Sequence, residues 1–170
     1  MNKWDIAHIH VARVYANLSY AMRLSVGAVI VKNDSIIGIG YNGMPSGWSN
    51  VCESKEYMPV MEGDSHQWPF DPEEEYPFEE GESARYRLVT HPEVLHAEAN
   101  AIAKVARGTV SGEGATMYIT HSPCLNCAKL IYQAGIVRVV YGEEHRNSDG
   151  LEFLEMCGIK SERLDLDVPV

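Results

Sequence analysis

The first forty residues carry two hydrophobic patterns of different period. Between residues 4 and 20, apolar side chains recur at the spacing of one helical face, which predicts an amphipathic helix. Segments 25–31 and 36–40 are short apolar runs that flank the turn residues 32–35, so we expect two strands joined as a hairpin. The apolar positions of the expected helix are Ala7, Val11, Val14, Tyr15 and Leu18.

Residues 48–92 show no helical or strand period. They are rich in proline, glycine, aromatic residues and carboxylates. Structureless loops longer than about 15 residues are uncommon in compact domains, so we expect an irregular insertion with a function of its own. A lid, a subunit contact and an effector site all fit this description. The carboxylates between Asp71 and Glu82 are typical of a solvated surface.

Regular patterns resume after residue 93. The alanine-rich stretch from Val94 to Arg107 is expected to be helical and to stop at Gly108. Ser122 as N-cap and Pro123 as the first helical residue predict a second helix. Strands that alternate with helices indicate an α/β fold with crossover connections in a single domain spanning residues 1–170. The other expected elements are strands at 116–120 and 137–141, a helix at 148–157 and an extended piece at 164–168.

Length and charge exclude several classes of function. A chain of 170 residues is long enough to bury its own core. The net charge of −10 disfavours a polynucleotide partner, because its phosphates would be repelled, but it leaves room for a mononucleotide. No stretch approaches the roughly 20 apolar residues of a membrane span, and the first residues do not resemble a signal peptide. We therefore expect a cytoplasmic protein with no membrane partner.

Three side chains form a candidate zinc site. His96 supplies an imidazole, and Cys124 and Cys127 supply two thiols three residues apart. These ligand types suit Zn²⁺, and three protein ligands leave the fourth tetrahedral position open for water. Thiolates are expected at Cys124 and Cys127 if both lie in the first turn of a helix, where the helix dipole is positive.

Glu98 is the expected general base of this site. A residue two positions after His96 faces away from it in the middle of a helix. Both side chains address one point only if the helix begins near His96, so we expect the site to lie between two helix N-termini. The alternative is a structural zinc site closed by a fourth ligand, for which Cys52 and Cys157 are available.

Four segments resemble the deoxycytidylate deaminase family of the zinc-dependent cytidine deaminase superfamily. The pattern His96-Ala97-Glu98 with Pro123-Cys124-x-x-Cys127 is similar to the superfamily signature. The resemblance covers about residues 1–47 and 93–160 and does not extend to the insertion. The segments that carry it are 26–30, 38–45, 96–102 and 127–136.

The resemblance implies a three-layer α/β/α fold with a mixed central sheet of about five strands. It implies hydrolysis of dCMP to dUMP and ammonia, which supplies dUMP for thymidylate synthesis. His96, Cys124 and Cys127 would then bind a catalytic Zn²⁺, and Glu98 would shuttle protons. Asn42 would hold the sugar 3′-hydroxyl group, and the backbone of Ala97 would hold the edge of the base.

Members of this family are commonly homohexamers, activated by dCTP and inhibited by dTTP with Mg²⁺. The resemblance therefore implies a homo-oligomer, here a hexamer, with an effector site to which Gly43 and Asn100 would contribute. Arg23 is a candidate for binding the 5′-phosphate, although a surface arginine fits the sequence equally. Val26 could pack on the pyrimidine or in the core.

Some viral relatives carry a second, structural zinc, and this sequence departs from their pattern. The position that matches one of their cysteine ligands is Ala21. Cys52, His66 and His91 remain as ligands for such a site.

Two other functions stay open. A tRNA or single-stranded DNA deaminase would require a basic groove with aromatic platforms, and the acidic balance speaks against it. A non-catalytic, zinc-stabilised binding module would require a fourth protein ligand and would not need Glu98.

Overall fold

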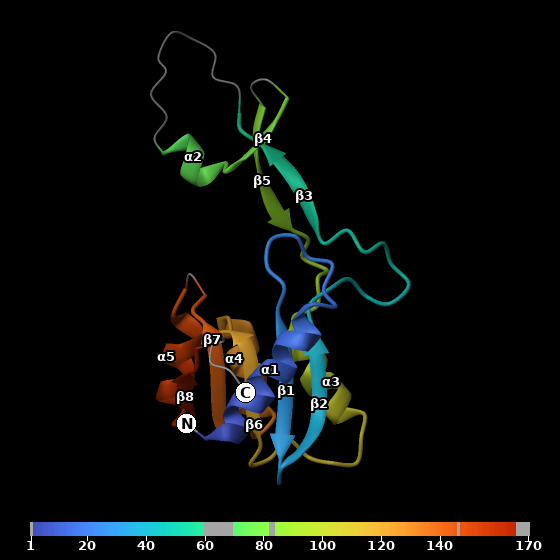
Figure 1. Cartoon of the computed structure of the whole chain (residues 1–170), viewed down its shortest axis with the longest axis vertical. Helices are drawn as coiled ribbons and strands as arrows, with labels where there is room; N and C mark the ends of the chain where they lie inside the picture. Colours follow the sequence, from blue (N-terminus) through green and yellow to red (C-terminus); the bar gives the residue numbers. More distant parts are fainter. Residues whose placement is uncertain (1, 60–69, 82–83, 146, 166–170) are drawn as a thin grey trace.

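A mixed five-stranded sheet in the order β2-β1-β6-β7-β8 forms the centre of the protein in a computed structural model (Figure 1). The structure describes residues 2–59, 70–81, 84–145 and 147–165. Strand β1 pairs antiparallel with β2 and β6, whereas β6, β7 and β8 are parallel. The expected mixed sheet is confirmed. Its strands are β1 (Gly27–Lys32), β2 (Ser35–Tyr41), β6 (Thr116–His121), β7 (Arg138–Glu143) and β8 (Lys160–Arg163).

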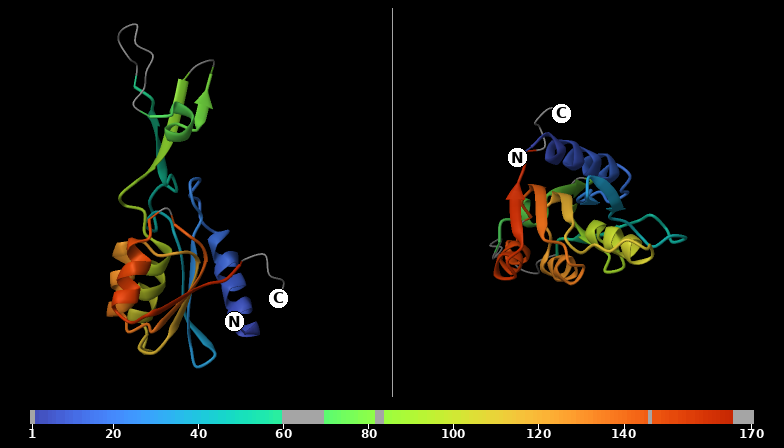
Figure 2. Two further views of the ribbon diagram at one scale, coloured as in Figure 1. Left: turned by 90° about the vertical axis from the view of Figure 1, so that its left-hand side faces the viewer. Right: turned by 90° about the horizontal axis from the view of Figure 1, so that it is seen from below.

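Helices cover both faces of this sheet, which confirms the three-layer α/β/α arrangement (Figure 2). Side chains of a strand point alternately to its two faces, so β1 contributes to two cores. Val29 and Val31 pack with α1, and Ala28 and Ile30 pack with the helices of the opposite face. The helices are α1 (Lys3–Ala16) on one face, and α3 (Ala97–Ala106), α4 (Leu125–Gln133) and α5 (Asp149–Met156) on the other.

The predicted hairpin is confirmed. Lys32 pairs with Ser35 across a two-residue turn. Asn33 and Asp34 both have positive φ, at 49° and 58°. Two-residue hairpin turns require this conformation, and asparagine and aspartate adopt it more readily than most residues.

Helix α1 is shorter than predicted, and its buried face matches the expected one only in part. It ends at Ala16, and Ile9, Ala12 and Ala16 are buried. Val14 and Leu18, which were expected on the buried face, are exposed. Val11 and Tyr15 are half-buried against the same core, as expected, and α1 lies close to the sheet where Ala12 and Ala16 meet Gly27 of β1.

The insertion at 48–92 was predicted to be irregular, and that prediction is wrong for the residues that the structure describes. It forms a three-stranded antiparallel sheet in the order β3-β5-β4. We call this sheet and the short helix α2 the arm, which projects away from the central sheet (Figure 1). Its elements are β3 (Glu53–Tyr57), α2 (Pro72–Glu75), β4 (Phe78–Glu80) and β5 (Ala84–Thr90).

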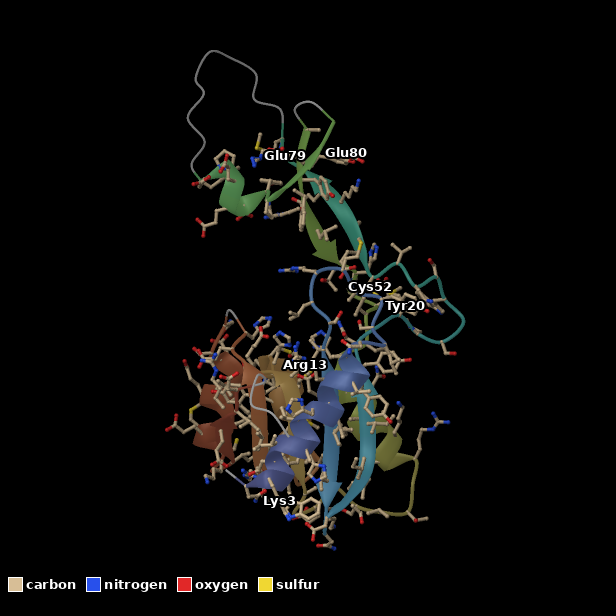
Figure 3. The ribbon with its side chains drawn as sticks, in the orientation of Figure 1. Lys3, Arg13, Tyr20, Cys52, Glu79 and Glu80 are labelled. Carbon is tan, nitrogen blue, oxygen red and sulfur yellow. The ribbon has the colours of Figure 1, made fainter. Side chains whose placement is uncertain are left out.

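The arm has no hydrophobic alternation because neither of its faces packs against the body, so its strands are mostly exposed or half-buried. Aromatic rings and ion pairs join its strands instead. The rings of Tyr86 and Phe78 stack with their centroids 5.3 Å apart, and Lys55 forms an ion pair with Glu80 at 2.6 Å. Several carboxylates of the acidic run are thus paired with cations of the arm and are not merely solvated. Figure 3 shows Glu79 and Glu80 on the arm.

The end of the chain differs from the prediction. An extended piece was expected at 164–168, but β8 lies at Lys160–Arg163, and residues 166–170 lie outside the described part of the chain. No helix in the described ranges has the length and apolar character needed to cross a membrane.

Candidate active site

Two helix N-termini meet at the candidate site. His96 is the N-cap of α3, with φ −75° and ψ 151°, and Cys124 is the N-cap of α4, with φ −69° and ψ 164°. His96 therefore has an extended backbone, and Glu98 lies in the first helical turn. The two side chains, two positions apart, can therefore address one point. The predicted helix start near His96 is confirmed.

The predicted helix bounds at the site need correction. Helix α3 begins at Ala97 and not at Val94, and α4 begins at Leu125 and not at Pro123. Ser122 is no N-cap, because its hydroxyl group accepts a hydrogen bond of 2.8 Å from the backbone N–H of His145. Its side chain thus joins the two loops that follow β6 and β7.

The three candidate ligands converge. The Nδ1 atom of His96 lies 3.4 Å from the sulfur of Cys127 and 3.7 Å from the sulfur of Cys124. Ligand atoms on a tetrahedral Zn²⁺, with bonds of about 2.0 Å to nitrogen and 2.3 Å to sulfur, lie roughly 3.6 Å apart. The donor set and its spacing therefore fit Zn²⁺.

A fourth protein ligand is not offered by the residues that the structure describes. His96, Cys124 and Cys127 are the group of potential ligands found there. Cys52 is buried in a separate apolar cluster, and Cys157 packs at the edge of the main core. A three-ligand site leaves a coordination position for water, which is the arrangement of catalytic zinc sites and not of structural ones.

The two thiols have different affinities for protons. Hydrogen bonds from the Cys127 thiol and from His96 lower the pKa of Cys124 to about 3. The hydrogen bond with Cys124 and burial raise the pKa of the Cys127 thiol. Hydrogen bonding to Cys124 also raises the pKa of His96. The pair thus offers one thiolate already, and a bound Zn²⁺ would displace the remaining proton.

Glu98 is almost entirely buried, with 4% of its surface exposed. Burial raises the pKa of its carboxyl group above the usual range of a glutamate. A carboxyl group with a raised pKa can both accept and donate a proton near neutral pH, as a general acid–base catalyst must.

Two glycines allow the helices to bring these residues together. A side chain on Gly40 of β2 would place its Cβ 2.0 Å from the backbone oxygen of Ala97, so glycine is needed where α3 begins. A Cβ on Gly150 of α5 would lie 1.9 Å from the backbone oxygen of Pro123, beside the start of α4. Both helix starts thus rest on backbone contacts that only glycine permits.

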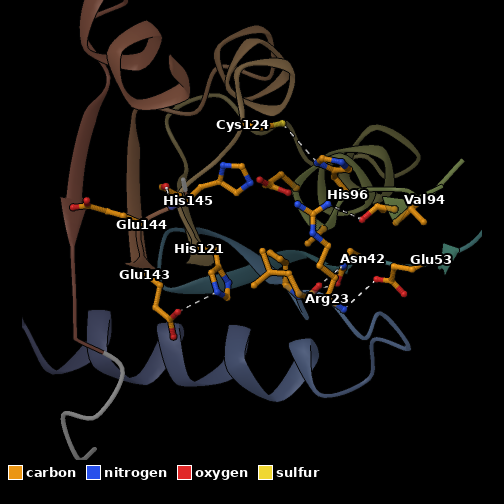
Figure 4. Close-up of a pocket in the computed structure, with 16 residues that line it drawn as sticks. Arg23, Asn42, Glu53, Val94, His96, His121, Cys124, Glu143, Glu144 and His145 are labelled. Carbon is orange, nitrogen blue, oxygen red and sulfur yellow. Dashed lines mark hydrogen bonds and ion pairs between the residues drawn. The ribbon is translucent and has the colours of Figure 1, made fainter. Parts of the chain in front are cut away.

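A cavity of about 490 Å³ opens at this point (Figure 4). The predicted catalytic residue and all predicted substrate-binding residues line the cavity, together with two of the three predicted zinc ligands. Cys127, the third ligand, is buried behind it. The predicted residues that line the cavity are Arg23, Val26, Asn42, His96, Ala97, Glu98 and Cys124.

The two predicted effector residues do not line this cavity. Gly43 exchanges backbone hydrogen bonds with Leu95, at 3.1 and 2.9 Å. The side chain of Asn100 donates a hydrogen bond of 2.8 Å to the backbone oxygen of Tyr41. Both residues lie where the segment after β2 meets the start of α3.

Asn42 ties two loops together beside the cavity. Its side-chain oxygen accepts a hydrogen bond of 2.8 Å from the N–H of Val26, and its amide group donates one of 2.8 Å to the oxygen of Leu24. An amide group can form four hydrogen bonds, so one lone pair and one N–H remain for a ligand.

Sequence reasoning missed several polar residues of the cavity. His121 and Ser122 end β6 or follow it, and Glu143 to His145 do the same at β7. Ligands bind at the carboxyl ends of neighbouring parallel strands, so the polar residues after the two predicted strands were a usable signal. The others, Glu53 and Thr90, come from the arm, whose strands were not predicted.

His121 and Glu143 form a polar pair at this edge of the cavity. The Nε2 atom of His121 lies 3.3 Å from the Glu143 carboxylate. Burial lowers the pKa of His121, and the nearby Glu143 carboxylate partly offsets this lowering.

Of the residues left open for a second zinc, Cys52 and His91 lie in the described part of the chain, where neither belongs to a group of three potential ligands. Cys52 packs with Ala21 and Val94 in an apolar cluster at the junction of body and arm, where Figure 3 shows it near Tyr20. Burial raises the pKa of the Cys52 thiol, which favours the uncharged form. His91 donates a backbone hydrogen bond to Cys52. His66 lies outside the described residues.

Comparison with known proteins gives consistent matches. The model of the cytidine and deoxycytidylate deaminase zinc-binding region matches residues 2–143. The deoxycytidylate deaminase of enterobacteria phage T4 is 34% identical over 164 residues, which cover 89% of this chain and 85% of the phage protein. The human deoxycytidylate deaminase is 33% identical over 150 residues, which cover 86% of this chain and 69% of the human one.

A solved structure matches along almost its whole length. The dCMP deaminase of cyanophage S-TIM5, in complex with dCMP and dUMP, superposes with a TM-score of 0.73 and 33% sequence identity. The match covers 96% of this chain and 99% of the cyanophage chain.

Proposed function

Because the chain belongs to the cytidine and deoxycytidylate deaminase family, we propose that it hydrolyses dCMP to dUMP and ammonia. The observation that carries this proposal is the convergence of His96, Cys124 and Cys127 beside the buried carboxyl group of Glu98, at one cavity. The relatives named above support dCMP as the substrate, since their names state this activity and the cyanophage structure holds dCMP and dUMP.

His96, Cys124 and Cys127 would hold the zinc ion. When bound, Zn²⁺ supplies Lewis acidity that makes a water molecule nucleophilic near neutral pH. The two thiolates would balance its charge, and Glu98 lines the same cavity as His96 and Cys124.

Glu98 moves the protons of the reaction. Its carboxylate accepts one proton from the attacking water and delivers it to N3 of the cytosine ring, while the water oxygen adds to C4. It then passes the second proton to the amino group, the C4–N bond breaks and ammonia leaves. Burial of Glu98 keeps bulk water from competing for these protons.

The other cavity residues would hold the nucleotide. The free lone pair and N–H of Asn42 suit the sugar 3′-hydroxyl group, and the backbone of Ala97 at the start of α3 suits the polar edge of the base. Val26 offers an apolar contact for the ring. Arg23 supplies a guanidinium group for the 5′-phosphate, which such a planar cation binds well.

The regulatory part of the proposal rests on the family resemblance. It comprises activation by dCTP, inhibition by dTTP with Mg²⁺, a homohexamer and a cytoplasmic role in supplying dUMP for thymidylate synthesis. Gly43 and Asn100 lie together near the start of α3 and would contribute to the effector site. The net charge of −10 supports a free nucleotide and not a polynucleotide as substrate.

The test is an assay of zinc-loaded protein on dCMP, cytidine and a cytosine-containing oligonucleotide, with dCTP present. We expect ammonia release from dCMP, and none when Glu98 is replaced by alanine. Inactivity toward dCMP with dCTP present would overturn the proposal, and preference for the oligonucleotide would identify a polynucleotide deaminase. The activator is included because an allosteric enzyme can be inactive without it.

A further inference from the structure

A buried carboxylate at the base of the arm holds the loop that carries Arg23. Glu53 is the first residue of β3, and only 4% of its surface is exposed. Its two oxygens accept hydrogen bonds of 3.2 Å from the backbone N–H groups of Met22 and Arg23. These residues are about 30 positions earlier in the chain, so the contact joins the arm to the wall of the cavity.

The second contact to Arg23 also comes from the arm. Thr90 is the last residue of β5 and pairs directly with Glu53 in the arm sheet. Its hydroxyl group accepts a hydrogen bond of 3.5 Å from the guanidinium group of Arg23. Neighbouring strands of the arm thus hold both the backbone and the side chain of this one arginine.

The guanidinium group remains available for an anion. Arg23 lines the cavity, and its side chain extends into it from a backbone beside Glu53 (Figure 4). Across the residues that the structure describes, Arg23 forms no ion pair. The carboxylate of Glu53, which contacts the backbone of the same loop, accepts its hydrogen bonds from backbone N–H groups.

This arrangement has a physical reason. A buried carboxylate requires hydrogen-bond donors, and the Arg23 guanidinium group would be the strongest donor available. An ion pair between the two would neutralise the cation and withdraw it from the cavity. Because the backbone N–H groups satisfy Glu53 instead, the loop is fixed while the charge of Arg23 stays unpaired.

We propose that Glu53 is a positioning residue that holds Arg23 toward the 5′-phosphate of the nucleotide. This inference rests on the proposed function, because it requires a monophosphate substrate. It gives the arm a role in recognising the phosphate group, with Thr90 as the second support. Enzyme activity then depends on the base of the arm through substrate affinity and not through the chemical step.

The experiment measures KM and kcat for dCMP in zinc-loaded wild type and in the variants Arg23→Ala, Glu53→Ala, Glu53→Gln and Arg23→Ala/Glu53→Ala. Inhibition by dUMP and by deoxyuridine, which lacks the phosphate, is measured in parallel. The matched control is Glu56→Gln, because Glu56 lies on the same strand and pairs with Arg87 of the arm, at 2.9 Å. Zinc content and melting temperature are recorded for every variant.

We expect Arg23→Ala and Glu53→Ala each to raise KM for dCMP by about tenfold or more with kcat nearly unchanged, as loss of a charge-assisted contact would do. Glu53→Gln keeps one acceptor oxygen and should show a smaller rise. In the Arg23→Ala background, loss of Glu53 should add less than about twofold, because the two residues act as a unit. Inhibition by dUMP should weaken in parallel, and inhibition by deoxyuridine should not.

Three results would overturn the proposal: additive effects of the two substitutions, equal weakening of dUMP and deoxyuridine, and a Glu53→Gln variant that behaves like Glu56→Gln. If Glu53→Ala does not fold, Glu53→Gln decides the question. Loss of zinc or of kcat in that variant would show that Glu53 supports the whole fold. A wild-type protein that does not deaminate dCMP would instead refute the proposed function itself.

Discussion

The Nδ1 atom of His96 lies 3.4 Å from the sulfur of Cys127, although 31 positions separate the two residues. They meet because the helices α3 and α4 begin at the same end of the central sheet, beside the carboxyl ends of β2 and β6. The contact makes the metal site dependent on the packed fold.

We predict one zinc ion for each chain. Replacement of Cys127 by serine, or of His96 by alanine, should reduce bound zinc to near zero, since two ligands hold the metal much less tightly than three. Elemental analysis of dialysed protein measures this. Cys157→Ser is the control and should retain the metal, because Cys157 lies outside the ligand group. Two zinc ions per wild-type chain would contradict the prediction.

Replacement of Glu98 by glutamine should lower kcat for dCMP by about 10²- to 10⁴-fold and leave zinc content unchanged. Glutamine has nearly the same shape but cannot carry the transferred proton. Single-turnover assays with metal analysis of the same sample measure both quantities. A variant with near wild-type kcat would show that another group transfers the proton.

The stability of the fold should depend on pH through Asp5, a buried residue in the first turn of α1. A hydrogen bond from Arg138 at 2.7 Å is the main reason that the pKa of Asp5 falls from 3.8 to about 2. A lowered folded-state pKa stabilises the protein above the unfolded pKa, and this stabilisation is lost as the pH falls from about 4 to 2. At pH 7 it amounts to about 2 kcal/mol.

Asp5→Asn should therefore lower the free energy of unfolding by about 2 kcal/mol at pH 7 and by much less near pH 3. Urea unfolding of both proteins at several pH values measures the difference. Loss of zinc in acid affects the two proteins alike, so the difference reports on Asp5. A difference that stays constant with pH would indicate a packing effect and not a charge effect.

Gly40→Ala should destabilise the protein by about 1–3 kcal/mol and weaken zinc binding, because the new Cβ would meet the backbone oxygen of Ala97 and displace the start of α3. Gly43→Ala is the matched control, since a Cβ there has no atom within 4 Å. Urea unfolding and a zinc competition assay measure the two effects. Equal behaviour of the two variants would show that α3 tolerates the shift.

The hairpin and the candidate zinc ligands carry strong local signals, whereas the mixed sheet was expected from the family resemblance. Asn33 and Asp34 are turn residues, and β1 reads as a continuous apolar run. The start of α3 near His96 followed from chemistry, because His96 and Glu98 could serve one site only at a helix terminus. The limits of α1 and α4 were less predictable, since packing and capping decide them.

The arm was not predictable because its strands bury no face, so no alternation of apolar residues marks them. Its contact with the loop of Arg23 could not be predicted either. The contact joins segments about 30 positions apart, and its donors are backbone N–H groups, which carry no sequence signal.

The sequence by itself predicted the candidate ligand types, a candidate acid–base residue and the alternation of helices and strands, because these depend on side-chain chemistry and local period. Only the tertiary structure decided which face of α1 is buried, which polar residues share the cavity with Glu98, and that Glu53 of the arm holds the loop of Arg23. Those relationships depend on contacts between segments far apart in the sequence, such as the close approach of α3 to β2 that Gly40 permits.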